Sequence, residues 1–377
     1  NIPNYLLTWE KSYNTNIGID AAFLNNRIDV SMEYYNTKTK DVIWNKALPV
    51  INGAFSPDGG PKANYTTNLN MCETSNKGFE LALNTRNIIT KNFTWSSSVT
   101  FNHNKEKITK LSGGDSDVLN NGDTGYALAL GEAINSYYHY KLDGVWQKGE
   151  ETDAAVFGAA PGDLKINIPN LVKESDGRFY KIDEETGSAA VDENGNVIYY
   201  TSDNKYTPSD ADYQILGHNS PDWSLGFQNN FTWKDFDLSV FVYARYGQMF
   251  AYDMLTSYDP KGIRNFPTYF NYWTENNPSN DFPAANANKG LEQYTGYYAL
   301  RYVDGSFIKI KNITLGYSLP KSILKSAGIE KCRFYATITN PFVFAKSHLL
   351  KDYDPEMNGS LKYPLTKQFV FGVNVTF

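Results

Sequence analysis

The sequence predicts an all-β chain whose strands form part of a transmembrane antiparallel β-barrel. Apolar and polar residues alternate with a period of two in segments spread along the 377 residues, and the connections between these segments are short and long in turn. No apolar run approaches the roughly 20 residues that a spanning helix needs. Aromatic residues make up 15% of the chain and charged residues only 20%, so we expect strands with one apolar and one polar side.

Nine segments carry the alternation clearly. Within one of them, Phe93, Val99 and Phe101 share one face, whereas Thr94 and Asn102 share the other. The expected strands, in chain order, are residues 6–23, 28–43, 76–87, 93–106, 223–233, 236–248, 307–319, 331–340 and 367–377.

The connections between the expected strands alternate in length. Short links fall at residues 25–26, 87–92, 234–235 and 320–330, and long ones at about 45–75, 107–222, 248–306 and 341–367. An outer-membrane barrel has tight periplasmic turns and long extracellular loops, whereas loops of this length are unusual in a soluble sandwich. If strand direction alternates, residues 107–222 contain either no spanning strand or two, with residues 137–146 as one candidate. The total is then about nine to eleven strands.

Aromatic residues gather near the ends of the alternating segments, where a barrel places its interfacial girdles. The alternative is that these rings pack between two sheets in a secreted all-β protein. The residues concerned are Trp9, Tyr34, Tyr35, Trp44, Trp95, Trp223, Trp233 and Tyr246.

Composition excludes several classes of function. The formal net charge is −6 and no run of Lys or Arg forms a polybasic stripe, which argues against nucleic acid as a partner. Two cysteines and four histidines, with no HExxH motif, leave little for zinc chemistry. The acidic residues Asp183, Glu184 and Glu185 lie in a polar loop with nothing apolar to raise a pKa. We therefore expect no catalytic residue and no enzymatic activity.

The last segment of the chain has a specific pattern. It ends in an outward apolar row and a terminal Phe, and so resembles the signal that barrel-insertion machinery recognises in outer-membrane proteins. The row consists of Phe369, Phe371, Val373, Val375 and Phe377.

A longer motif precedes it. Residues 304–320 read DGSFIKIKNITLGYSLP and resemble a stretch of the SusC/RagA family of TonB-linked outer-membrane transporters from Bacteroidetes. Further matches occur in family order across nearly the whole chain. They include WEKS at 9–12, NIGID at 16–20, GFE at 78–80, GVWQ at 144–147, PGD at 161–163 and DPE at 354–356.

The resemblance implies that residues 1–377 are the C-terminal part of a barrel of about 22 strands. On this resemblance we expect the plug domain and the N-terminal barrel strands to be absent from this sequence, which begins at Asn1 without an initiator Met or a signal peptide. A half-barrel leaves two open edges in lipid, so we expect another stretch of polypeptide to complete it.

The implied function is TonB-dependent nutrient import across the outer membrane, with a glycan or an oligopeptide as cargo. Expected partners are a SusD-like lipoprotein lid, outer-membrane lipid, the remaining half of the barrel and, through the absent N-terminal part, the TonB–ExbB–ExbD complex. Two alternatives stay open: a siderophore or vitamin receptor of the same fold, and a secreted all-β glycan-binding protein.

Two loops hold candidate sites. Aromatic rings stack on sugar faces and amides bond hydroxyls, so Tyr269, Tyr272, Trp273 and Asn276 are the candidate substrate contacts. The alternative for each is packing against the lid.

The other loop has oxygen-bearing side chains around Gly195, as calcium loops do, although it lacks the closing Glu. Either it binds a structural calcium ion or it is an ordinary β-turn, and we expect no other cofactor. The candidate ligands are Asp192, Asn194 and Asn196.

Overall fold

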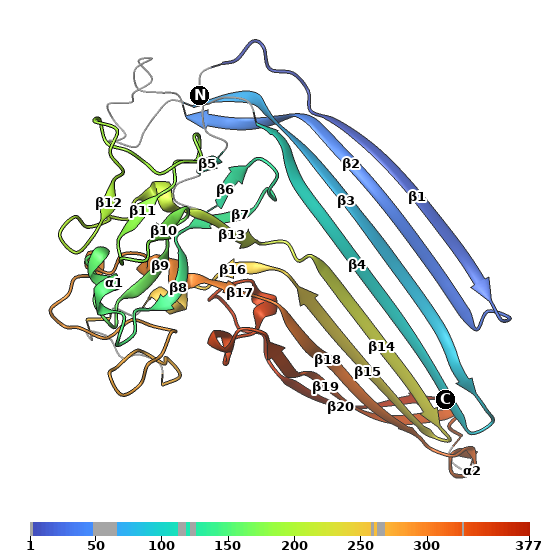
Figure 1. Cartoon of the computed structure of the whole chain (residues 1–377). Coiled ribbons are helices and arrows are strands. Elements are labelled where there is room, and N and C mark those ends of the chain that lie inside the picture. Colours follow the sequence, from blue (N-terminus) through green and yellow to red (C-terminus); the bar gives the residue numbers. More distant parts are fainter. Residues whose placement is uncertain are drawn as a thin grey trace.

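The computed structural model describes residues 3–47, 66–111, 118–120, 126–257, 260–261, 268–325 and 328–377. Its dominant feature is one antiparallel sheet of nine long strands, which Figure 1 shows as a single curved wall. Their order across the sheet is β1 (Lys11–Phe23), β2 (Ile28–Ala47), β3 (Thr66–Ile89), β4 (Phe93–Leu111), β14 (Trp223–Trp233), β15 (Phe236–Tyr246), β18 (Phe307–Ser318), β19 (Lys331–Ala345) and β20 (Gln368–Thr376).

The nine predicted strands are confirmed, although the first begins at Lys11 rather than at residue 6, and the described residues between β4 and β14 add no further strand to this sheet. β4 pairs directly with β14, from His103 opposite Trp223 to Phe93 opposite Trp233. The interpretation of residues 137–146 as a spanning strand is wrong. These residues form β7 (Ser136–His139) and β8 (Lys141–Val145), which belong to two separate small sheets and are too short to cross a membrane.

Several strands extend further than the alternation predicts. β3 begins at Thr66 rather than 76, and β2 and β4 run on to Ala47 and Leu111. The added part of β3 is polar in composition and resembles a loop in sequence, yet Met71 and Cys72 are buried there. Cys72 packs with Ile108 of β4, with Trp44 of β2 and with Leu128, which follows β4 in the chain, so tertiary contacts hold these extensions in strand conformation.

Residues directly opposite each other in the ladder share a face, and the register therefore defines two faces. One row runs Ile19, Met32, Leu81, Phe101 and Leu225 across β1 to β14. We call this side the apolar face. The row on the other side of the same strands is Gly18, Glu33, Glu80, Asn102 and Ser224, and we call that side the polar face.

Short turns lie at one end of the sheet and the small elements at the other (Figure 1). We call the described residues 126–222, 249–257, 268–306 and 346–367 the cap. Its strands are β6 (Tyr126–Ala129), β7, β8, β9 (Leu164–Asn167), β10 (Leu171–Lys173), β11 (Phe179–Lys181), β12 (Tyr199–Tyr200), β13 (Gln214–His218), β16 (Met249–Ala251) and β17 (Tyr302–Asp304).

A further strand, β5 (Val118–Asn120), pairs with β6. The α-helices are α1 (Glu151–Val156) in the cap and α2 (Lys321–Leu324) at the opposite end of the sheet. Six 3-10 helices complete the described cap: Asp210–Asp212, Asp253–Thr256, Leu291–Gln293, Tyr297–Arg301, His348–Leu350 and Pro355–Met357. Within the described ranges, no helix has the length and apolar character needed to cross a membrane.

Candidate functional site

The apolar face of the sheet is largely uncovered. Leu315 is 52% exposed and Phe371 is 81% exposed, and in the described parts of the chain no second sheet packs on this side. A secreted sandwich would bury such residues in a core, so the secreted alternative is not supported. A lipid environment suits this face because it is apolar over nine adjacent strands.

Not every aromatic residue expected in an interfacial girdle lies on the apolar face. Trp223 stacks on Tyr246 there, with ring centroids 5.5 Å apart. Tyr35 lies on the polar face, where its hydroxyl donates to Asn104 Oδ1 at 2.9 Å, and Trp44 packs against the buried Cys72 cluster. Their girdle assignment is wrong because the sequence shows where a strand ends more clearly than which face a ring occupies.

The C-terminal strand places its apolar row on the apolar face. Phe369, Phe371 and Val373 lie opposite Ile338, Ala336 and Phe334 of β19. Val375 follows on the same side, and these side chains together with Phe377 are exposed. β20 pairs with β19 on one side only, so its other edge carries unpaired backbone groups in this chain.

The polar face forms a shallow groove of about 330 Å³ over β2, β3, β4 and β14. Glu33 and Glu80 lie directly opposite each other in it, and Asn102 Nδ2 donates to Glu80 Oε1 at 2.9 Å. Asn16 donates to Glu33 from the neighbouring strand. Two carboxylates at adjacent positions repel each other, so this wall favours a cationic or hydrogen-bond-donating neighbour in the space that it faces.

The cap has its own aromatic core. Phe270 stacks on Phe282 with centroids 4.3 Å apart, and Trp273 packs in the same cluster, only 8% exposed. Trp273 Nε1 donates to Gln147 Oε1 at 2.9 Å. A Cβ on Gly162, which has φ +95°, would lie 2.8 Å from the Trp273 ring, so the PGD motif passes closely over this indole.

The four candidate substrate residues separate into two groups. Trp273 lies in the cap core, and Tyr269 is partly buried against it. Tyr272 is 41% exposed, and Asn276 is exposed as well. For Trp273 the structure supports packing, although the packing partners belong to this chain rather than to a lid. Tyr272 and Asn276 are the members of the set that a ligand can reach.

The candidate calcium loop is a tight turn that already satisfies its carboxylate. The backbone amides of Asn194 and Asn196 each donate to Asp192 Oδ1 at 2.9 Å. Hydrogen bonds from the backbone amides of Asn196 and Asn194, that of Asn196 having the largest effect, lower the pKa of Asp192. Together they outweigh desolvation, which would raise it. Amide donors therefore stabilise the charge of Asp192. The described residues contain no group of three or more His, Cys, Asp or Glu side chains arranged to hold a metal.

Residues 352–362, within the last segment of the cap, fold onto the polar face. We call these residues the strap. Lys309 of β18 is fully buried beneath it, with Nζ 2.5 Å from Asp354 Oδ2 and 2.8 Å from Glu356 Oε2. Lys311 Nζ lies 2.6 Å from Glu356 Oε1. Burial raises the pKa of Glu356, but hydrogen bonds and attraction from both lysines outweigh it, so the pKa is lowered overall.

The sequence contains both halves of this network but does not reveal that they meet. Lys309 and Lys311 stand in the DGSFIKIK motif, and the two carboxylates form the DPE motif 45 residues later. One feature of the sequence does point to such a network. Lys309 stands between apolar residues of a strand, and a lysine at a buried position requires an anionic partner.

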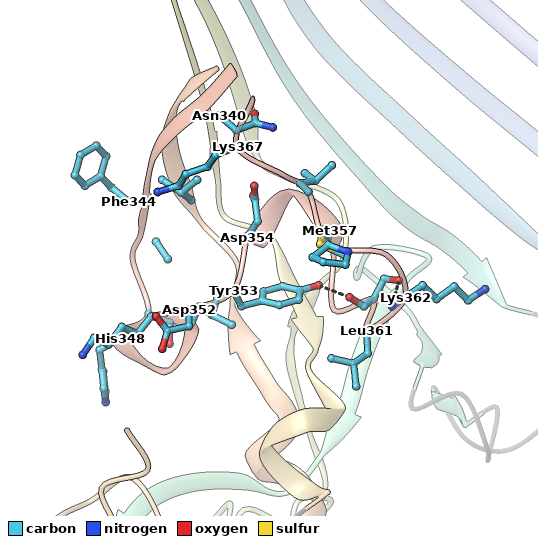
Figure 2. Close-up of a pocket in the computed structure, with 18 residues that line it drawn as sticks. Asn340, Phe344, His348, Asp352, Tyr353, Asp354, Met357, Leu361, Lys362 and Lys367 are labelled. Carbon is cyan, nitrogen blue, oxygen red and sulfur yellow. Dashed lines mark hydrogen bonds between the residues drawn. The ribbon is translucent and has the colours of Figure 1, made fainter. Parts of the chain in front are cut away.

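The strap forms part of the lining of a cavity of about 760 Å³, whose other lining residues lie within 340–351 and 364–367. Figure 2 shows Tyr353 within it, with its hydroxyl directed at the Ser360 carbonyl oxygen, 3.1 Å away. Burial raises the pKa of Tyr353 to about 12. The cavity lies where β19 continues past its last pair with β20, Thr339 opposite Gln368, so it borders the open edge of the sheet.

Comparison with known proteins identifies relatives over nearly the whole chain. The family model described as TonB dependent receptor-like, beta-barrel matches residues 1–147. TonB-dependent receptor P3 of Formosa agariphila is 28% identical over 98% of this chain and 34% of its own length. TonB-dependent receptor SusC of Bacteroides thetaiotaomicron is 28% identical over 99% of this chain and 32% of its own length.

The fold has solved counterparts too. A structure of the RagAB peptide transporter superposes with a TM-score of 0.69 and 25% sequence identity, covering 98% of this chain and 36% of that chain. The chain spans about a third of the length of the relatives that it matches.

Proposed function

The chain belongs to the SusC/RagA family of TonB-dependent receptors, and from this premise we propose that it forms the C-terminal wall of an outer-membrane nutrient importer. The observation that carries the proposal is the open nine-stranded sheet, with one apolar face, one polar face and an unpaired strand at each edge. Unpaired backbone groups are not viable in lipid. β1 and β20 therefore pair with other strands of a larger barrel, and the length of the relatives leaves room for those strands and a plug.

In this proposal, the polar face lines the transport path and the cap lies on the extracellular side. Long loops on one side of the sheet and tight turns on the other support that orientation. A SusD-like surface lipoprotein covers the cap, and the TonB–ExbB–ExbD complex supplies energy through the preceding part of the polypeptide. The barrel moves its cargo without bond chemistry.

The cargo in this proposal is a glycan or an oligopeptide. Tyr272 and Asn276 support direct contact with either, because an exposed phenol ring stacks or donates and an amide both donates and accepts. The terminal row of β20 supports a role in recognition during barrel insertion, since its side chains remain exposed on the apolar face.

The test uses the native full-length protein, purified in detergent from outer membranes. The expected result is an intact mass more than about twice the 42.6 kDa of this chain and a co-purifying lipoprotein. Uptake of labelled oligosaccharides and oligopeptides by cells with and without the gene then identifies the cargo, and an uncoupler abolishes uptake. A detergent-independent, soluble 42.6 kDa protein would overturn the proposal.

A further inference from the structure

Five lysines lie together on the apolar face where β2, β3 and β4 approach the cap. The register places Lys38 opposite Ser75, which lies opposite Lys107, and places Lys77 opposite Lys105. We call these lysines, together with Lys40, which lies opposite Lys11 of β1, the lysine patch. Three adjacent strands thus present five ammonium groups on the side that carries the apolar rows.

All five side chains are exposed. Lys40 lies 6.0 Å from the centroid of the Tyr13 ring. In the described part of the chain, no carboxylate lies within ion-pairing distance of the other four, whereas lysines that border the patch are paired: Lys11 with Asp41 and Lys110 with Glu73. Unpaired lysines this close together repel one another, so the patch favours an anionic neighbour.

The patch has a defined position along the strands. On β3, Leu81 is followed toward the cap by Phe79 and then by Lys77. On β4, Phe101, His103 and Lys105 repeat the order of apolar, aromatic and cationic side chains. Two residues of strand span about 7 Å, so the lysines begin about 7 Å beyond the rings of Phe79 and His103 in the direction of the cap. In a barrel with an aromatic girdle at this level, that is the height of the lipid headgroups.

The sign of the charge is specific to this face. The chain as a whole carries a net charge of −6, and the polar face of β1, β2 and β3 presents Asp20, Asp29, Glu33 and Glu80. A general excess of lysine therefore does not explain the patch.

We propose that the lysine patch binds the phosphate groups of a phosphorylated glycolipid in the outer leaflet of the outer membrane. Each basic residue near a membrane surface contributes on the order of 1 kcal/mol to attraction of an anionic headgroup. The exposed side chains of Ile17 and Met32 on the same face offer contact for acyl chains. A lipid with both parts fits the patch better than a free anion does. This inference rests on the placement of the sheet in the membrane, not on the cargo.

The experiment uses the full-length protein in detergent and native mass spectrometry, with bisphosphorylated lipid A as the probe. The comparison probe is lipid A from which both phosphates have been removed. The patch variant carries the substitutions Lys38→Gln, Lys77→Gln, Lys105→Gln and Lys107→Gln.

A matched control removes four exposed lysines from the other end of the sheet. It carries Lys91→Gln, Lys321→Gln, Lys325→Gln and Lys331→Gln. A third variant has Arg at the four patch positions. Heat-modifiable mobility on gels establishes that each variant is folded.

We expect the patch variant to bind phosphorylated lipid A roughly tenfold or more weakly than the wild type. The control and the Arg variant should bind it as the wild type does, and dephosphorylated lipid A should not distinguish the proteins. Equal binding by the wild type and the patch variant would overturn the proposal. So would an equal loss in the control, or displacement of the lipid by an equimolar amount of inorganic phosphate, which would point to a site for free anions.

Discussion

Tyr35 lies directly across the ladder from Gly78, and a Cβ built on Gly78 would fall 2.2 Å from the Tyr35 ring. The glycine therefore leaves the space that the tyrosine covers. The same arrangement recurs at the other side of the sheet, where Gly372 lies opposite Tyr335 and its Cβ would fall 2.4 Å from that ring. In both pairs a ring covers a neighbouring strand, which fixes the register of the two strands.

Replacing Gly78 with Ala should destabilise the barrel by about 1–3 kcal/mol, because the Tyr35 ring must leave its position. The change should also weaken the 2.9 Å hydrogen bond from the Tyr35 hydroxyl to Asn104. The measurement is the urea midpoint of the full-length protein in detergent, followed by heat-modifiable mobility on gels. Tyr35→Leu provides the control background: Gly78→Ala should cost much less there, and an equal cost in both backgrounds would show that the ring is not the cause.

Lys309→Met should release the strap from the polar face. The substitution leaves Asp354 and Glu356 without their buried cation, and breaking a buried pair in this way costs about 3–5 kcal/mol. Hydrogen exchange followed by mass spectrometry should show faster exchange over residues 352–362 and unchanged exchange in β3 and β4.

Lys311→Met is the matched control, because Lys311 binds the same Glu356 but keeps 30% of its side chain exposed. Its effect should be clearly smaller, since the buried pair at Lys309 remains. If both variants exchange at the same rate, burial of Lys309 does not determine how firmly the strap is held.

The periodic parts of the fold follow from the sequence, and the contacts between distant loops do not. Alternation over residues 93–106 and 223–233 predicts two strands, and their neighbouring places in the sheet satisfy the alternating direction of the chain. By contrast, Thr66 to Ser75 resembles a loop because it shows no alternation. Its strand conformation depends on pairing with the ends of β2 and β4 and on the packing of Cys72 against Leu128 of the cap. Trp273 illustrates the same limit. An aromatic residue in a polar loop is equally compatible with a ligand site and with a local core, and only the positions of Gln147 and Gly162 distinguish them.

Acidification should loosen the small sheet that contains β7. His139 stacks on Tyr213, with centroids 4.8 Å apart, and burial, assisted by Arg301, lowers its pKa from 6.5 to about 4. The folded cap therefore favours the neutral imidazole. This stabilisation is complete above about pH 6.5 and is lost as the pH falls toward 4.

Proteolysis of the cap between pH 7 and pH 4 measures the effect. In the wild type, cleavage within residues 126–139 should become faster as the pH falls, whereas His139→Gln should largely remove this dependence. His348→Gln serves as the control, because its imidazole is exposed and bonded to Asp281. A pH profile that is the same in the wild type and in His139→Gln would assign the loosening to other groups.

Substitutions at Trp273 and Tyr272 should separate cap stability from cargo contact. Trp273→Ala removes a buried ring and its hydrogen bond to Gln147, which should cost about 3–5 kcal/mol of cap stability and raise protease sensitivity. Tyr272→Ala and Asn276→Ala alter exposed side chains, so cap stability should change by less than about 0.5 kcal/mol. If these residues contact the cargo, both variants should lower uptake at subsaturating cargo and recover at high cargo concentration. Normal uptake by both variants, with an intact cap, would remove Tyr272 and Asn276 from the transport path.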